Sequence, residues 1–279
     1  MNILLTGYKG FIGRNIEKRL VADGDEVHTI GEEFLLLDKD WRLNLHNFII
    51  DADIDEVLHV GACSDTLETN VNYMMTLNYE FTVVLSDICH KYGIPLVYSS
   101  SAANTGTDGL QPANLYGWSK KAAEDYVVKN GQIALRYYNV YGPGEEDKGK
   151  MASVAFQSYK KMLSGEQVYL FPGRPSRDFV YIEDVVSANI FALENYHLLG
   201  KKYYHVGSGE SRTFEDVMNI LGIPYEYTSE DAVPKGYQYY TVSDRDKMMH
   251  GWRPKFKLED GVGTYRKHLE NFFTKNEKM

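Results

Sequence analysis

The sequence has few cysteines, no excess of basic residues and no long apolar run. Cys63 and Cys89 are the two cysteines among 279 residues, so we expect two reduced thiols rather than a disulfide framework. With 30 basic against 39 acidic residues, the net charge of -9 argues against a nucleic-acid-binding surface. No apolar run approaches a membrane span, and no basic region precedes an apolar N-terminal stretch. These absences predict a cytoplasmic protein that binds neither nucleic acid nor a membrane.

The length and composition favour a globular protein with two domains. A hydrophobic share of 43% and a charged share of 25% are ordinary for a folded chain, and 279 residues exceed the usual size of one core. Short apolar runs alternate with helical patterns until about residue 150, where the alternation weakens. The pattern predicts an α/β fold, a doubly wound parallel sheet of the Rossmann type with a smaller mixed α/β substrate domain. We place the first domain at 1–150 and 178–212, and the second at 151–177 and 213–279.

The elements of this prediction follow from hydrophobic spacing. The predicted strands are 2–6, 26–30, 34–37, 57–60, 94–98, 133–138, 168–171 and 203–206. The main predicted helices are 71–92, 151–163 and 178–195, together with helices after the glycine-rich turn and around Tyr116.

A glycine-rich turn, Gly7-Tyr-Lys-Gly10-Phe-Ile-Gly13, directly follows the first predicted strand. Glycines permit a tight turn and let a pyrophosphate approach the N-terminus of the following helix. The spacing differs from the common G-x-G-x-x-G, and a purely structural turn is the alternative. We expect a dinucleotide to bind here through Gly7, Gly10, Phe11, Ile12 and Gly13.

The choice between NADP and NAD depends on the residues that would face the cofactor's ribose. A carboxylate at the end of the second strand would hold the 2'-hydroxyl of NAD, and Glu32 lies near this position. Gly31 occupies the strand end itself, however, and Lys9 and Arg14 flank the glycine turn, where they suit a 2'-phosphate. We therefore predict NADP, with NAD as the alternative.

Small residues follow the predicted strand at 57–60, at the edge of the sheet where a ligand would cross. These are Gly61, Ala62 and Cys63, and we expect them to contact the cofactor. Asn78 lies on the next predicted helix and is expected to reach the cofactor as well.

Three serines, Ser99, Ser100 and Ser101, follow the next strand. A hydroxyl at this edge can hold a substrate oxygen. The alternative, a cap on the next turn, has most weight for Ser99 and Ser100.

Tyr116 and Lys120 are spaced four residues apart in N-L-Y-G-W-S-K-K. On a helix this spacing places both side chains on one face. A nearby ammonium favours the phenolate and would move Tyr116 toward proton transfer near neutral pH. An exposed tyrosine beside a solvated lysine is the alternative for this pattern on its own.

The order of these parts resembles the extended short-chain dehydrogenase/reductase family. The glycine turn, serine edge and tyrosine–lysine helix are followed by R-Y-Y-N-V-Y-G-P from Arg136. Longer strings are similar to the nucleotide-heptose epimerases of that family: H-V-G-A-C-S-D-T from His59, K-G-K-M-A-S-V-A-F from Lys148 and R-D-F-V-Y-I-E-D-V from Arg177. The resemblance covers almost the whole chain.

The resemblance implies a nucleotide-sugar epimerase acting on ADP-heptose, in lipopolysaccharide core biosynthesis, as a homo-oligomer without a metal. Such an enzyme oxidises one sugar carbon with bound NADP and returns the hydride to the opposite face. By position, Tyr116 and Lys148 would be the two acid/base groups, Lys120 would bind the cofactor ribose, and Ser101 would hold the reacting oxygen. The other assigned positions are Val140 for the cofactor and Ser101, Asn139, Lys150, Gln157, Arg177 and Tyr237 for the substrate.

Three residues depart from the family pattern. Gln157 stands where a histidine is expected, Lys150 where a serine is expected, and Val60 where an acidic residue is expected. Gln157 and Lys150 belong to the substrate side, so another nucleotide-sugar epimerase or a 4-keto reductase is the alternative enzyme.

Two further alternatives are weaker on the residues. A dehydratase of this family would carry acidic residues directly after Ser101, where Ala102 and Ala103 stand. A catalytically inactive cofactor-binding protein is the alternative from another class, and the intact set of Ser101, Tyr116 and Lys120 argues against it.

The run from Glu145 to Lys150 reads as a charged loop, and simple solvation of that loop would make Lys148 an ordinary surface lysine. Arg177 is expected to bind the diphosphate, with pairing to a surface carboxylate as its alternative.

Overall fold

The computed structural model describes residues 1–32, 34, 39–106, 111–235 and 237–276, which form two compact units. Unit 1 comprises Met1–Tyr137, Val186–His205 and Lys247–Trp252, and unit 2 comprises Tyr138–Val185, Val206–Asp246 and Arg253–Met279. The boundaries differ from the predicted domains, since the contacts group residues 138–150, 178–185 and 206–212 with the second unit and residues 247–252 with the first.

Unit 1 is built on a parallel sheet. Within the described residues the sheet has six strands in the order β10-β5-β4-β3-β1-β2. β1 pairs in parallel with β2 and β3, and β4 pairs in parallel with β3 and β5. The predicted doubly wound parallel sheet is therefore confirmed. The strands are β1 (Asn2–Thr6), β2 (Glu26–Ile30), β3 (Glu56–His59), β4 (Leu96–Ser101), β5 (Ile133–Tyr137) and β10 (Tyr203–Val206).

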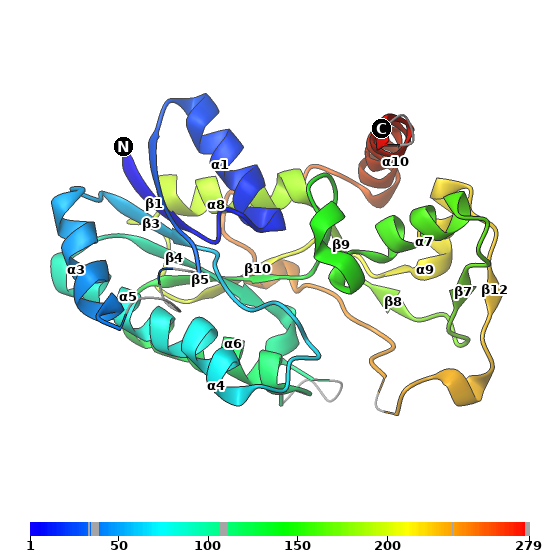
Figure 1. Cartoon of the computed structure of the whole chain (residues 1–279), viewed down its shortest axis with the longest axis horizontal. Coiled ribbons are helices and arrows are strands. Elements are labelled where there is room, and N and C mark those ends of the chain that lie inside the picture. The colour runs from blue at the N-terminus through cyan, green and yellow to red at the C-terminus, as the bar shows by residue number, and fades with distance from the viewer. Residues whose placement is uncertain (33, 35–38, 107–110, 236, 277–279) are drawn as a thin grey trace. The chain divides into compact units, whose positions relative to one another are not determined.

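Helices cover both faces of this sheet, with α1 and α8 on one face and α3, α5 and α6 on the other (Figure 1). Strands buried on both faces need continuous apolar side chains, and Leu4, Leu5 and Leu58 are fully buried. The helices are α1 (Phe11–Asp23), α3 (Trp41–Asp51), α4 (Val71–Met75), α5 (Phe81–Tyr92), α6 (Leu115–Lys129) and α8 (Ile182–Glu194).

The structure differs from the predicted elements at several points. α3 was not predicted, although Trp41, Leu45 and Ile49 are buried at helical spacing. The single helix predicted at 71–92 contains a π-helical turn, Thr76–Glu80, between α4 and α5. The strand predicted at 34–37 lies outside the described residues apart from Phe34.

Among its described residues, unit 2 combines three two-stranded sheets with three α-helices. β6 (Asn139–Tyr141) pairs in parallel with β9 (Phe179–Tyr181), and β7 (Tyr169–Leu170) pairs in parallel with β12 (Glu226–Tyr227). β8 (Ser176–Arg177) pairs antiparallel with β11 (Arg212–Thr213). The helices are α7 (Val154–Leu163), α9 (Phe214–Leu221) and α10 (Leu258–Asn276).

Side-chain caps set where the helices of unit 2 begin. The hydroxyl of Ser153 accepts a hydrogen bond from the Phe156 amide, so α7 begins at Val154 rather than at the predicted residue 151. Thr213 and Asp216 form a reciprocal capping box at the start of α9.

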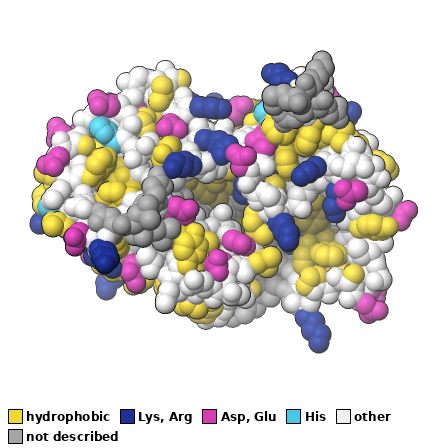
Figure 2. Space-filling model, in the orientation of Figure 1, with side chains coloured by type: hydrophobic (Ala, Val, Ile, Leu, Met, Phe, Trp, Pro, Cys, Tyr) yellow, Lys and Arg dark blue, Asp and Glu magenta, His cyan; other side chains and the backbone are white. Residues whose placement is uncertain are grey.

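No helix in the described ranges is long and apolar enough to cross a membrane. On the face shown in Figure 2, acidic and basic side chains are interspersed. The described residues on this face therefore mix charges of both signs.

Candidate active site

The glycine turn of unit 1 is packed too closely for side chains. Gly7 has a φ of +70°, and a Cβ there would lie 2.5 Å from the Cα of Gly61. A Cβ on Gly13 would lie 2.1 Å from the carbonyl oxygen of Gly7. Gly10 is the N-cap residue of α1 and has no side chain that could accept a hydrogen bond from the amides of the first turn. This closely packed glycine turn at the N-terminus of a helix fits a dinucleotide pyrophosphate.

Two further residues of the predicted turn differ in exposure. The side chain of Phe11 is buried in the core, so its contribution to a ligand would come from the main chain. Ile12 is half-buried.

The edge formed by Gly61, Ala62 and Cys63 is held in place by Asn78. The Asn78 side chain accepts from the Cys63 amide at 2.7 Å and donates to the Cys63 carbonyl at 3.0 Å. It also donates to the Ser119 hydroxyl at 2.9 Å, and it is fully buried. Asn78 therefore positions the main chain of Cys63, and its direct contact with a cofactor stays a prediction.

A second support for this edge was missed from the sequence. The Thr6 hydroxyl accepts from the Gly61 amide at 2.9 Å and lies 2.7 Å from Nδ1 of His59. Nε2 of His59 lies 2.8 Å from the Thr82 hydroxyl, which itself donates to the Asn78 carbonyl. Burial lowers the pKa of His59 to about 3, so the ring is neutral and can donate at one nitrogen and accept at the other.

The three serines of β4 have different partners. The Ser99 hydroxyl pairs with Tyr137 at 2.8 Å, and the Ser100 hydroxyl donates to Glu124 at 2.6 Å; both serines are buried. Ser101 is partly exposed, and its hydroxyl accepts from the Ala103 amide at 3.2 Å. The turn cap is thus Ser101 rather than Ser99 or Ser100.

Tyr116 lies in the first turn of α6, where the Asn114 side chain accepts from the Gly117 amide at 2.8 Å and caps the helix. Burial raises the pKa of Tyr116, and a hydrogen bond with the Ser101 hydroxyl opposes that rise. The structure therefore brings together Ser101 and Tyr116, as the sequence predicted.

Lys120 follows one turn later on α6 and is 3% exposed. Its ammonium nitrogen lies 4.2 Å from the ring centroid of Tyr98. Burial lowers the pKa of Lys120 to about 7, and the charge of Glu124 acts in the opposite direction. In this structure burial dominates and raises the pKa of Tyr116, where the sequence predicted a lowered one.

In unit 2, Lys148 lies in a short 3-10 helix, Glu146–Met151, and not in a solvated loop. Glu145 is fully buried, and its carboxylate accepts from the Gly142 amide and from the amide and hydroxyl of Ser153. The Lys148 amide donates to the Glu145 carbonyl at 3.0 Å. Lys148 is half-buried, and its burial lowers the pKa of the ammonium while Glu145 opposes the shift.

The same turn is also linked to α10. The Glu146 carboxylate lies 2.7 Å from Nε2 of His268 and accepts from the Gly144 amide at 3.2 Å. The contact with His268 attaches the turn that carries Lys148 to α10.

Arg177 of unit 2 is 9% exposed and lies between two aromatic rings. Its guanidinium carbon is 5.3 Å from the ring centroid of Tyr237 and 5.5 Å from that of Phe214. Burial lowers the pKa of Arg177, and a hydrogen bond with Tyr237 opposes the shift. Arg177 is thus a buried side chain and not a surface arginine paired with a carboxylate. Its neighbour Phe214 was not predicted from the sequence.

The remaining predicted substrate residues lie in unit 2, where Asn139 on β6 and Lys150 are exposed. Val140, which was predicted to contact the cofactor, is half-buried on β6 and also belongs to unit 2. The Gln157 amide group donates to the carbonyls of Lys150 and Ala152 at 3.0 and 2.6 Å. Gln157 therefore binds the Lys148 turn to α7, and its contact with a substrate stays a prediction.

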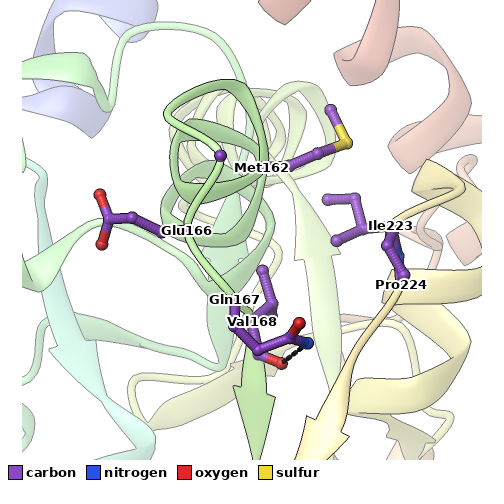
Figure 3. Close-up of a pocket in the computed structure, with 7 residues that line it drawn as sticks. Met162, Glu166, Gln167, Val168, Ile223 and Pro224 are labelled. Atoms are coloured by element: carbon purple, nitrogen blue, oxygen red, sulfur yellow. Dashed lines mark hydrogen bonds between the residues drawn. The ribbon is translucent and has the colours of Figure 1, made fainter.

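A pocket of about 230 Å³ in unit 2 contains none of the predicted site residues (Figure 3). Gln167 donates to the Val168 carbonyl beside it at 3.1 Å. The lining residues are Met162, Gly165, Glu166, Gln167, Val168, Ile223 and Pro224. This pocket offers no candidate acid/base pair.

Cys63 and Cys89 are buried free thiols. Across the described parts of the chain, no group of three or more His, Cys, Asp or Glu residues is arranged to hold a metal ion.

Comparison with known proteins finds that this chain is similar to enzymes that act on nucleotide sugars. It is 34% identical to the ADP-L-glycero-D-manno-heptose-6-epimerase of Brachyspira hyodysenteriae, over 96% of this chain and 98% of the relative. The crystal structure of the Helicobacter pylori enzyme of the same name superimposes with a TM-score of 0.83 at 26% identity, covering 96% of both chains.

The Thermotoga maritima UDP-glucose 4-epimerase, solved with UDP-glucose, gives a TM-score of 0.82 at 25% identity, covering 98% of this chain and 100% of that one. The model of the NAD dependent epimerase/dehydratase family matches residues 3–207. The chain therefore belongs to the NAD dependent epimerase/dehydratase family, within the extended short-chain dehydrogenases/reductases.

Proposed function

We propose that the chain is an ADP-L-glycero-D-manno-heptose 6-epimerase that inverts C6 by transient oxidation with bound NADP. The observation that carries the proposal is the pairing of Tyr116 with Ser101, together with the buried Lys120 one turn later on α6. The heptose-epimerase relative, 34% identical over nearly the full length of both chains, supports the substrate class.

The cofactor would lie on the glycine turn, with its pyrophosphate at the N-terminus of α1 and Lys120 on a ribose. A bound nicotinamide would accept the hydride of the carbinol carbon and return it. Ser101 would hold the sugar oxygen, and Tyr116 would exchange a proton with it. A phenol whose pKa is raised by burial stays protonated near neutral pH and suits proton donation to the ketone oxygen.

Inversion also needs a proton carrier for the other face of the sugar. Lys148 suits this role because burial lowers its pKa, so its ammonium releases a proton more easily than a lysine in water. Arg177 would bind the diphosphate, and Tyr237, Asn139 and Gln157 would contact the rest of the ADP-sugar.

The proposal is tested by incubating the purified protein with a panel of nucleotide heptoses and hexoses and following each epimer by NMR. We expect turnover of ADP-heptose, and no deuterium at the inverted carbon when the reaction runs in heavy water. Deuterium at that carbon would indicate enolisation. Turnover of a UDP-hexose alone would favour the 4-epimerase or 4-keto reductase alternative, and no turnover of any sugar would favour the inactive cofactor-binding protein.

NADP is expected to bind more tightly than NAD. The Arg14 guanidinium donates to the Lys9 carbonyl at 2.7 Å, which holds a cation at the glycine turn, near the expected 2'-phosphate. The Glu32 carboxylate, which would serve NAD, accepts a hydrogen bond from the Tyr73 hydroxyl at 3.2 Å. Calorimetric dissociation constants for both cofactors check this, and clearly tighter binding of NAD would overturn it.

Replacing Arg177 by lysine is expected to raise the substrate KM about tenfold with little change in kcat, because lysine cannot donate in a planar fork to two phosphate oxygens. The control is Arg266→Lys, since Arg266 pairs with Glu270 on the surface of α10. An unchanged KM in Arg177→Lys would direct attention to Arg174, whose side chain is 72% exposed in the preceding loop.

A further inference from the structure

A buried carboxylate, Glu124, connects several parts of the unit 1 site. It lies on α6 one turn after Lys120 and two turns after Tyr116, on the same face of the helix, and is 1% exposed. Its Oε2 accepts from the Ser100 hydroxyl at 2.6 Å and from the Asn104 amide group at 3.0 Å. Arg136 on β5 forms a two-pronged ion pair with it, at 2.7 Å to Oε2 and 2.5 Å to Oε1.

The hydrogen bonds that Ser100 and Asn104 donate to Glu124 involve residues on both sides of Ser101 in the chain. Ser100 precedes it on β4, and Asn104 ends the 3-10 helix Ala102–Asn104 that Ser101 caps. The Asn104 amide group also donates to the Ser100 hydroxyl at 3.0 Å, which closes a triangle of hydrogen bonds with Glu124. The backbone on both sides of Ser101 is therefore attached to the helix that carries Tyr116.

The charge of Glu124 also opposes the lowering of the Lys120 pKa that burial causes. Among the described residues, the titratable groups near that ammonium are Tyr98 on β4, His59 on β3 and, one turn to either side on α6, Tyr116 and Glu124. His59 is neutral, and burial raises the pKa of both tyrosines, so these three groups carry no negative charge near neutral pH. Arg136 is the counterion of the Glu124 carboxylate, and its guanidinium carbon lies 3.6 Å from the ring centroid of Tyr203.

We propose that Glu124 is a positioning residue that attaches the Ser101 edge to α6 and keeps Lys120 cationic for the cofactor. The expected effect of Glu124 on catalysis rests on the proposed function, whereas its effect on the charge of Lys120 does not. The simpler alternative is that Glu124 only neutralises Arg136 and stabilises the fold.

The test is the titration of Lys120 in the full-length protein, followed by NMR of isotope-labelled lysine and assigned with Lys120→Arg. In Glu124→Gln we expect the pKa of Lys120 to fall by about one unit from its value of about 7. Because a lower pKa means that the cation is lost at lower pH, NADP binding measured at neutral pH should weaken about fivefold. The weakening should be recovered as the pH is lowered.

Asp125→Asn is the matched control, since Asp125 pairs with Lys121 at 3.0 Å on the exposed face of the same helix with the same spacing. It should leave the Lys120 titration and NADP binding unchanged. Glu124→Gln leaves Arg136 buried without its counterion, so Glu124→Gln/Arg136→Met is measured alongside. The double variant should also show a lowered Lys120 pKa.

An unchanged Lys120 pKa in both variants, with only a loss of thermal stability, would overturn the proposal and favour the purely structural role. If Lys120 shifts as expected but no nucleotide sugar is turned over by the wild type, the proposed function fails and the inference on Glu124 stands.

Discussion

Tyr116→Phe is expected to lower the kcat of epimerisation by about a thousandfold, within the usual range for a general acid–base group. The substitution removes the hydroxyl that pairs with Ser101 and leaves the ring in place. The helix cap at Asn114 and the burial of Lys120 do not depend on that hydroxyl, so NADP should bind with nearly wild-type affinity. Steady-state kinetics and calorimetry measure the two quantities separately.

Tyr126→Phe is the control for this variant. Tyr126 lies on the same helix, and its hydroxyl donates to Asp87 at 2.8 Å on the surface, so removing it should leave kcat within about twofold of the wild type. A Tyr116→Phe enzyme with nearly full kcat would show that another group exchanges the proton with the sugar oxygen.

Lys148→Met is expected to lower the kcat of epimerisation by two to three orders of magnitude, roughly the contribution of one acid–base group. Methionine retains much of the length of the side chain but cannot carry a proton. The buried Glu145 attaches the turn to Gly142 and Ser153 without using the lysine side chain, so the turn should keep its conformation. The half of the cycle that reduces the ketone should survive at one face of the sugar, because the protonated Tyr116 can still donate to the ketone oxygen.

The pH dependence gives a second readout for Lys148. Because its folded-state pKa is lowered, the neutral amine is available at lower pH than for a lysine in water. Activity that needs the amine should therefore rise with pH and level off below the usual lysine range, and Lys148→Met should abolish this rise. Lys161→Met, on the exposed end of α7, is the control that should behave as the wild type. Near-normal epimerisation by Lys148→Met would leave Tyr116 as the acid/base group for both faces.

The short-range patterns of the sequence were sufficient for much of unit 1. Turn residues, hydrophobic period and helix spacing act within a few positions, so the glycine turn after β1, the six described strands of the parallel sheet and the Tyr116–Lys120 face could be predicted. α3 carried a signal of the same kind, and its buried Trp41, Leu45 and Ile49 could have revealed it.

Only the tertiary structure decided the burial, the hydrogen-bond partners and the pKa shifts of the polar residues. Glu145 lies in a run of charges that reads as solvated, yet residues three positions before and eight positions after it supply the donors that allow its burial. The sequence alone does not distinguish the three consecutive serines. The packing of β5 and α6 against β4 gives Ser99 its hydrogen bond with Tyr137 and Ser100 its hydrogen bond with Glu124. Burial also reverses the expected effect on Tyr116, because desolvation penalises the phenolate more than the neighbouring groups favour it. The partners of Ser99 and Ser100 are distant in the chain, and a local pattern contains no information about them.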